Sequence, residues 1–348
     1  MSNTNKNHII DEVQKLTLTA FESPLWDNDE KKWFRIMNME SGEVDTNIHY
    51  YYDLCNIYSL ARTMRIIPEL SRFETQWLDA VNWLFWLLIN NPEIGYNSLG
   101  VKHSRDQYSF ALSPSVLAEA YLRTDRKALL EKAIELFANY RTKLPAATSM
   151  NVQASNHIIL SALSLFKVTN DVRFLNDAIK EGKFLFEKCR FEDGPAQGCF
   201  TDDFTVTAFP RHCYGAWALM ELNRWTNEYD WVGIAEKSLK WWLDIQLPDG
   251  GFHFFFNAKE NEWSDKTVYS VHQKGMLLLS AWDINRETGG RYSDMIKRAM
   301  SCCDNSHWKF TSPQNWNCWR RSNQEPQVVY SYELGWEILG HALAIGSD

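Results

Sequence analysis

Apolar residues recur at helical spacing along most of the chain, with charged residues on the opposite face. Positions i, i+3, i+4 and i+7 are apolar in the stretches 73–89, 126–140, 172–189, 231–245 and 291–302. This spacing predicts amphipathic helices that each bury one face. Alternation of apolar and polar residues is short by comparison, and only 251–256 (GFHFFF) is expected to form a β-hairpin arm.

A second kind of segment recurs at intervals of about 50–60 residues and is apolar on nearly all sides. Each of its six copies begins with aromatic residues, His or Glu, and continues with small and apolar residues. The copies begin near residues 49, 107, 151, 209, 269 and 330. Because a helix that is apolar all round is buried on both sides, we expect these six segments to form an inner layer.

Six buried segments that alternate with amphipathic ones predict an all-α fold, an (α/α)6 barrel of six helical hairpins. The stretch from about 7 to 21 supplies the outer helix of the remaining pair. The repeat runs through the chain without a Gly/Ser/Pro-rich linker, which predicts a single toroid domain over residues 1–348. The alternative is an open superhelix of repeats that binds proteins. The number six, and the polar residues gathered at one end of the segments, favour the closed barrel.

Composition narrows the classes of function. The chain carries 16 Trp, 14 Tyr and 19 Phe among 348 residues, which excludes disorder. A net charge of −8 without a Lys/Arg cluster argues against a nucleic-acid partner. The most apolar run, 83–89, is far shorter than the roughly 20 residues that span a membrane. A polar N-terminus without a secretion signal and seven irregularly spaced Cys predict a reduced, cytoplasmic chain.

The same composition bears on cofactors and on the aromatic residues. The Cys spacing includes no CxxC pair, so we expect no metal and no cofactor. The Trp residues of the amphipathic stretches are expected to pack between the two helical layers. They are Trp77, Trp83, Trp86, Trp241 and Trp242.

The residues that open the six buried segments face one end of the barrel if the hairpins alternate in direction. That end collects aromatic, His, carboxylate and Arg side chains. Such a set suits sugar binding, because rings stack on pyranose faces and polar groups bond to hydroxyls. The predicted substrate-binding residues are Asp53, Tyr52, Asp106, Tyr108, Asn156, His157, Arg211, Tyr269, Trp263, Trp319, Arg320 and Tyr332.

Two histidines are the sharpest candidates for acid/base catalysis. His212 and His272 lie 60 residues apart at equivalent repeat positions, and each is followed three residues later by Gly. We therefore expect them to project from adjacent inner helices toward one cavity, where His can exchange protons near neutral pH. The alternative is that both rings only bond to neighbouring turns within the buried layer.

Carboxylates and a second His supply further candidates. Asp202 and Asp203, directly before the fourth buried segment, and Glu333, at the start of the sixth, are predicted acids or nucleophiles. Their alternative role is to cap turns and helix N-termini. Asn156 and His157 could neutralise a uronic carboxylate and abstract its neighbouring proton, and Arg211 and Arg320 could clamp a carboxylate.

The repeat with its polar end resembles the six-hairpin enzymes that act on carbohydrates. These are the N-acylglucosamine 2-epimerase type, the glucuronyl C5-epimerases and the unsaturated uronyl hydrolases. In the first group inner-helix His residues act as acid and base, which His212 and His272 match in kind, although His-x-x-Gly stands here for His-x-x-Glu. In the uronyl hydrolases an inner-helix Asp is the acid, and Asp53 and Asp203 are candidates by position. Similar barrels occur in bacterial polysaccharide biosynthesis. The resemblance therefore also implies a role of this kind for the chain.

A second resemblance points to another class. The segment QLPDGGFHF (246–254), followed by Tyr-x-x-His-x-x-Gly, is similar to repeats of isoprenoid enzymes with helical toroids. Those enzymes use an Asp-x-Cys plus His zinc site or an Asp-rich motif. Here Asp-x-Cys occurs at residues 53–55, in the first repeat instead of a late one, and no Asp-x-Asp-Asp run is present.

We therefore expect an enzyme that acts on a sugar or a uronic-acid oligosaccharide by epimerisation, elimination or hydrolysis. The fold by itself does not choose among these reactions. The alternatives are an isoprenoid-type toroid enzyme and a non-catalytic glycan-binding toroid. A homodimer is left open.

Overall fold

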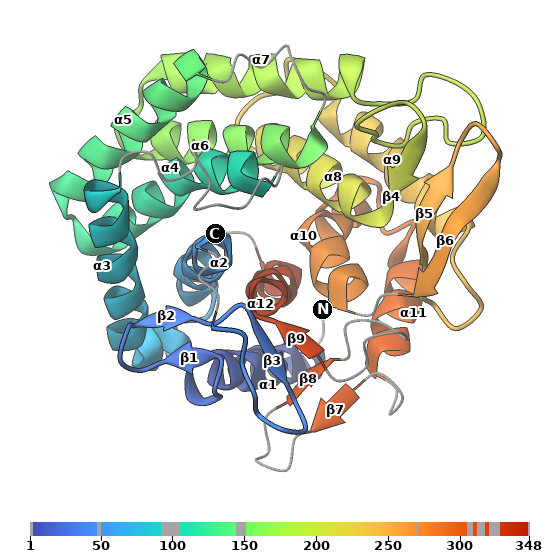
Figure 1. The fold of residues 1–348 in the computed structure, drawn as a ribbon. Coiled ribbons are helices and arrows are strands. Elements are labelled where there is room, and N and C mark those ends of the chain that lie inside the picture. Colours follow the sequence, from blue (N-terminus) through green and yellow to red (C-terminus); the bar gives the residue numbers. More distant parts are fainter. Residues whose placement is uncertain are drawn as a thin grey trace.

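Two concentric layers of helices make up most of the computed structural model (Figure 1). It describes residues 3–46, 50–91, 105–143, 151–268, 271–304, 309–311, 317–319 and 328–346. The inner helices are α2 (Tyr51–Ile66), α4 (Arg105–Thr124), α6 (Val152–Thr169), α8 (Phe209–Asn223), α10 (Val271–Glu287) and α12 (Ser331–Ile345). The outer helices are α1 (Asn3–Glu22), α3 (Glu74–Asn90), α5 (Lys127–Lys143), α7 (Val172–Lys188), α9 (Trp231–Asp244) and α11 (Ser293–Asp304).

The inner helices form a closed ring. Each packs against the next along the chain, and α12 packs against α2. Each outer helix packs on an inner one, and α1 covers α12, so the N-terminal helix completes the sixth pair. The predicted (α/α)6 toroid is confirmed, and the ring is visible end-on in Figure 1.

Outer helices bury one face and inner helices bury nearly all of theirs, as their sequence patterns predict. Trp77 on α3 and Trp242 on α9 are fully buried between the layers. The expectation is wrong for Trp86, which is 60% exposed. Trp86 lies on the outward face of α3, so this helix carries a large apolar side chain on the side that faces away from the inner layer.

Short strands lie in the segments that connect the helices. They are β1 (Trp26–Asp27), β2 (Lys32–Trp33), β3 (Ile36–Asn38), β4 (Val206–Ala208), β5 (His253–Asn257), β6 (Glu262–Val268), β7 (Lys309–Thr311), β8 (Asn317–Trp319) and β9 (Val328–Tyr330). All pairs are antiparallel: β1 with β2, β3 with β9, β7 with β8, and β5 with both β4 and β6. The β5–β6 hairpin confirms the arm expected near 251–256. A 3₁₀ helix, Pro68–Phe73, joins α2 to α3.

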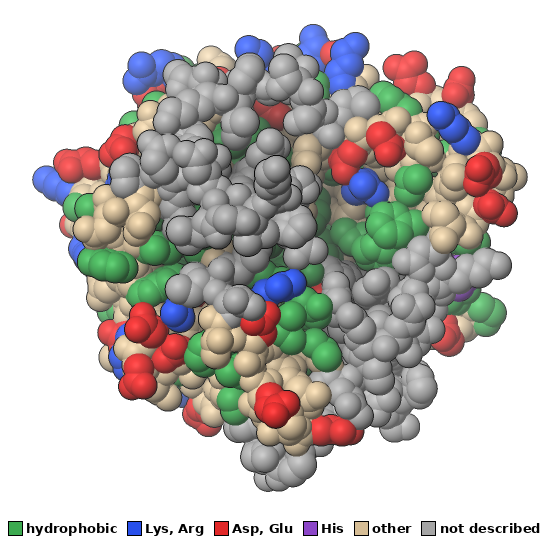
Figure 2. All heavy atoms as spheres, viewed as in Figure 1, with side chains coloured by type: hydrophobic (Ala, Val, Ile, Leu, Met, Phe, Trp, Pro, Cys, Tyr) green, Lys and Arg blue, Asp and Glu red, His purple; other side chains and the backbone are tan. Residues whose placement is uncertain are grey.

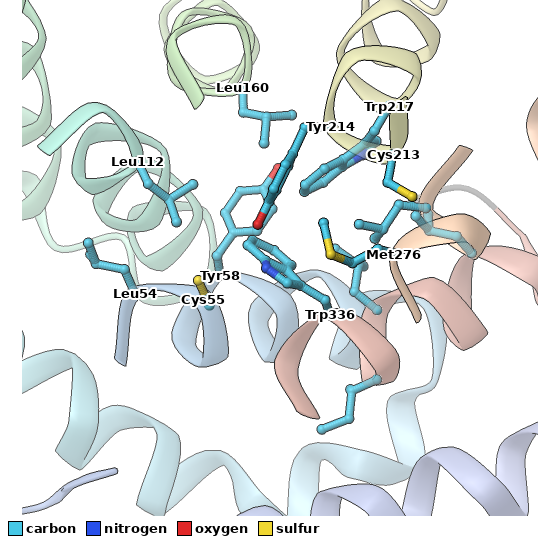
Figure 3. Packing of buried hydrophobic residues seen from close by; sticks show 14 of the residues in the cluster. Leu54, Cys55, Tyr58, Leu112, Leu160, Cys213, Tyr214, Trp217, Met276 and Trp336 are labelled. Atoms are coloured by element: carbon cyan, nitrogen blue, oxygen red, sulfur yellow. The ribbon is translucent and has the colours of Figure 1, made fainter. Parts of the chain in front are cut away.

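The axis of the inner ring is filled by aromatic side chains (Figure 3). The Trp217 and Trp336 rings lie 5.3 Å apart, and each lies within 6.3 Å of the Tyr58 ring. All three are buried and come from α2, α8 and α12. We name Tyr58, Trp217 and Trp336 the aromatic plug. It lies between the end where the inner helices begin and the end where they finish.

The glycines of the His-x-x-Gly pattern lie where packing leaves no room for a side chain. A Cβ on Gly275 would lie 2.6 Å from Glu337 Cα, and one on Gly215 would lie 2.5 Å from the Phe200 ring. The two glycines therefore allow close approach of α10 to α12 and of α8 to the preceding loop.

On the face shown in Figure 2, acidic and basic side chains are interspersed among polar and apolar ones. Within the described residues, no helix combines the length and apolarity needed to cross a membrane.

Candidate active site at the N-terminal end of the inner barrel

Side chains from the first two turns of three inner helices meet near the barrel axis. Gln153 Nε2 of α6 donates a hydrogen bond of 2.6 Å to Tyr51 Oη of α2. The Tyr51 and Tyr214 hydroxyl oxygens lie 3.3 Å apart. The His157 ring, one turn after Gln153, lies 5.8 Å from the Tyr51 ring and 5.6 Å from the Tyr214 ring. We name Tyr51, Gln153, His157 and Tyr214 the axial cluster.

Burial governs the ionisation of this cluster. Tyr51, His157 and Tyr214 are buried, whereas Gln153 is partly exposed. Desolvation raises the pKa of Tyr51 and the pKa of Tyr214 well above their ordinary values, because a buried phenolate loses its hydration. Both phenols therefore keep their protons at neutral pH and can act as hydrogen-bond donors.

Aromatic and basic groups flank the cluster. The Tyr332 ring of α12 lies 4.8 Å from the Tyr52 ring and 6.1 Å from the Tyr51 ring. Arg35 Nε donates to Tyr52 Oη (3.3 Å), and the guanidinium also lies 3.6 Å from Asp45. Strand pairing holds Arg35 here, since β3 follows it and pairs with β9, which leads into α12.

His212 does not face this cluster. Its Nδ1 lies 2.9 Å from Ser238 Oγ on the outer helix α9, and its ring lies 6.0 Å from that of Phe209. The side chain is fully buried, and burial lowers the pKa of His212 to about 3, so the ring is neutral. The expected projection toward a shared cavity is therefore wrong for His212, because this face of α8 is turned to the outer layer.

Asp53 and Asn156 also point away from the axial cluster. Asp53 Oδ1 accepts a hydrogen bond from the Trp33 backbone N–H (2.8 Å) and anchors β2 to α2. Asn156 Nδ2 donates to the Tyr214 carbonyl between α6 and α8 (2.9 Å). Successive residues on a helix differ by about 100° in direction, so Asn156 and its neighbour His157 face different elements.

The predicted carboxylate acids have structural partners or buried positions. Asp202 accepts from the Val152 backbone N–H at the start of α6 (2.9 Å) and pairs with Arg211 Nε (2.7 Å). Asp203 accepts from the backbone N–H groups of the two residues after Phe204, which closes a turn. Glu333 is buried in the first turn of α12. The capping alternative therefore describes Asp202 and Asp203.

The other predicted residues lie outside the axial cluster or outside the described residues. Trp263 on β6 packs against Trp242 of the outer layer, with ring centroids 6.0 Å apart. For six further predicted residues, the structure describes either the backbone alone or nothing. They are Asp106, Tyr108, Tyr269, His272, Trp319 and Arg320.

Four residues of this region were not among the predicted site residues. Tyr51 and Tyr214 lie on buried segments, and Gln153 lies four positions before His157, a spacing that places both on one helix face. That spacing was a usable signal. No sequence pattern indicated Arg35, because it lies in an irregular segment that only strand pairing brings to the barrel.

The described residues include no group of three or more His, Cys, Asp or Glu arranged to bind a metal ion. The described cysteines Cys55, Cys189, Cys199 and Cys213 are buried and free of disulfides.

The closed double ring places the chain among proteins with the (α/α)6 toroid fold. No protein-family profile and no curated protein matches the sequence. Solved structures are similar to its fold. Cellobiose 2-epimerase from Bacillus thermoamylovorans B4167 superposes with a TM-score of 0.75 at 11% sequence identity, and the match covers 97% of this chain and 99% of that one. A D-mannose isomerase gives 0.72 at 13% identity over 98% and 97%.

A third similar structure has a different activity. The α-1,6-mannanase GH76A from Salegentibacter sp. HEL1_6 gives a TM-score of 0.65 at 13% identity, over 97% of this chain and 98% of that one. At these identities the similarity establishes the shared fold of the whole chain. The activity has to be argued from the site.

Proposed function

We propose that the protein is a carbohydrate-active enzyme that moves protons on a bound sugar at the axial cluster. The observation that carries this proposal is the cluster that Gln153 and His157, one turn apart on α6, form with Tyr51 and Tyr214. Gln153 donates to the Tyr51 hydroxyl, the two tyrosine hydroxyls lie 3.3 Å apart, and the His157 ring lies beside both tyrosine rings. The similar structures support it, since their names describe a sugar 2-epimerase and a sugar isomerase.

His157 is the proposed base. An imidazole can take the proton from a carbon next to a sugar carbonyl, and a second group must return a proton to the enolate that forms. Tyr51 is one candidate for this acid, because its raised pKa keeps the phenol protonated. His272, at the start of α10, is the other.

The flanking residues suit a sugar in chemical type. Tyr332 offers a ring face, and Gln153 and Arg35 offer donors to hydroxyls or to a uronic carboxylate. All three are partly exposed. We propose that they bind the substrate, and that Tyr52 orients Arg35 through their hydrogen bond.

Hydrolysis by carboxylates is the less favoured reaction. The carboxylates of Asp202 and Asp203 accept hydrogen bonds from backbone N–H groups that they cap. The remaining predicted acid for hydrolysis is Glu333, which is buried. A cytoplasmic location, a role in bacterial polysaccharide biosynthesis and a homodimer stay predictions from the sequence.

Hydrogen exchange at the sugar carbon tests the proposal. The protein is incubated in D2O with D-mannose, D-glucose, N-acetyl-D-glucosamine and cellobiose, and loss of the C2 proton is followed by NMR. We expect exchange with one of them, and a fall of about 100-fold or more in His157→Gln. The matched variant is His212→Gln, which changes a His that faces the outer helix and is expected to retain the wild-type rate.

Two results would contradict the proposal. One is the absence of exchange with every sugar while an α-1,6-linked mannobiose is hydrolysed, which would favour a glycosidase. The other is a wild-type exchange rate in His157→Gln, which would remove His157 from the reaction.

A further inference from the structure

The inner barrel has a second polar region at its opposite end, where α2, α4, α6 and α8 finish. A pocket of about 280 Å³ lies there, beyond the aromatic plug. We name it the rear pocket. Its polar lining comes from four helices and the residues that follow α8: Arg62, Glu119, Ser164, Lys167, Glu221 and Arg224. Trp225 stands at its rim and is 40% exposed.

The lining is held by a network of buried charges. Arg62 pairs with Glu221 across the barrel, with 3.0 Å between nitrogen and oxygen, and also donates to the Tyr58 hydroxyl. Glu221 accepts from Trp217 Nε1 (3.0 Å) and pairs with Arg224 (3.2 Å). Two residues of the plug, Tyr58 and Trp217, therefore also hold Arg62 and Glu221 in the wall of the rear pocket.

Buried charges of this kind need an explanation beyond stability. Removing an ion pair from water costs about as much as the pair regains, and apolar residues of the same volume often stabilise a protein more. Arg62 and Glu221 are only 3% and 6% exposed. A rigid set of donors and acceptors around a small pocket is the arrangement that orients a bound ligand.

The charge balance indicates which ligand fits. Three basic and two acidic side chains line the rear pocket among the described residues. Their immediate partners Arg65, which pairs with Glu119, and Asp283, which pairs with Arg224, cancel each other. The excess of one positive charge is opposed by four helix C-termini, whose partial negative charges of up to about half a unit each bring the total close to or slightly below zero. Neither a strong anion nor a strong cation is favoured.

We propose that the rear pocket binds a neutral sugar unit. Each hydroxyl of a sugar can accept from a guanidinium or ammonium group and donate to a carboxylate, so a balanced lining of both signs suits it. The Trp225 ring at the rim offers an apolar face for stacking. The volume, just below the usual range for ligand pockets, matches one ring rather than a chain.

Binding of defined probes tests this site by calorimetry on the full chain. The probes are D-glucose, D-mannose and D-galactose, with glucuronate and glucose 6-phosphate as charged counterparts. We expect saturable binding of a neutral sugar that weakens at least 10-fold in both Trp225→Ala and Lys167→Gln. Trp86→Ala removes an exposed Trp elsewhere and is expected to bind as the wild type.

Gln153→Ala separates the two ends of the barrel. Sugar binding that survives in Gln153→Ala but not in Trp225→Ala supports the rear pocket, whether or not the proposed function holds. The inference is overturned if Trp225→Ala and Lys167→Gln bind as the wild type, if no neutral probe saturates, or if a charged probe binds at least 10-fold more tightly than every neutral one.

Discussion

Asp53 and His212 are buried side chains whose surroundings favour the uncharged form. Burial raises the pKa of Asp53 to about 8 and lowers the pKa of His212 to about 3. Near pH 7 both groups are largely neutral, and each bonds to a neighbouring element, Asp53 to β2 and His212 to α9. At the residue scale, these contacts join packed elements, and the proton chemistry we propose rests on His157 instead.

Asp53→Asn is expected to change how stability depends on pH. Between about pH 4 and 8 the folded protein holds a proton on Asp53 that the unfolded chain releases, so rising pH lowers the free energy of unfolding by about 1.4 kcal/mol per pH unit. Asn does not ionise and retains an oxygen for the Trp33 N–H. We expect the variant to match the wild type near pH 5 and to exceed it by about 2–4 kcal/mol at pH 8.

Urea denaturation of both proteins from pH 5 to pH 8.5 measures this difference. A difference that stays constant over this range would mean that Asp53 is ionised in the folded state.

Helices α10 and α12 pack so closely that small residues decide their contact. A Cβ on Gly340 would lie 2.3 Å from the Gly275 carbonyl oxygen, and one on Gly275 would meet the α12 backbone. The other inner pairs include polar contacts, such as Ser161 of α6 with the Ala111 carbonyl of α4 (2.6 Å). At the element scale, small residues at their crossings let α10 approach α12 and let α6 approach α4 closely.

Gly275→Ala tests this contact. Alanine favours a helix by about 1 kcal/mol over glycine, whereas a clash in a packed interface costs about 1–3 kcal/mol. We expect a net loss of up to about 2 kcal/mol in the free energy of unfolding, measured by guanidinium denaturation. The control is Gly346→Ala, where a Cβ would meet nothing within 4 Å; a loss as large there, or a gain at Gly275, would contradict the close packing.

The aromatic plug organises the whole molecule. It fills the middle of the inner barrel and contacts the rear pocket, because Trp217 donates to Glu221 and Tyr58 accepts from Arg62. Tyr214 of the axial cluster lies one helical turn before Trp217 (Figure 3). The described part of the toroid therefore has two polar regions with the aromatic plug between them.

Trp217→Ala is expected to destabilise the protein strongly. Removing a fully buried Trp leaves a large cavity and costs about 3–5 kcal/mol, and here it also removes a donor to Glu221. Trp86→Ala, at a Trp that is 60% exposed, is expected to change stability by less than about 0.5 kcal/mol. Equal losses in the two variants, measured by chemical denaturation, would refute the assignment of the plug.

The sequence by itself determined the architecture. Period and burial pattern predicted six inner helices, the outer helix near 7–21 that completes the ring, and the β5–β6 arm, because these depend on which residues must leave water. Part of the candidate site could also be predicted from the sequence, since Tyr52, His157 and Tyr332 were expected at the N-terminal end of the inner helices and lie there.

Only the tertiary structure decided which side chains face the axis. An inner helix is apolar on all sides, so its sequence does not say which face meets the outer layer, and His212 and His157 could not be told apart. Helix packing resolved this, since neighbouring positions point about 100° apart. Arg35 and the rear pocket depend on contacts between residues far apart in the chain, such as Arg62 with Glu221, and no local pattern encodes them.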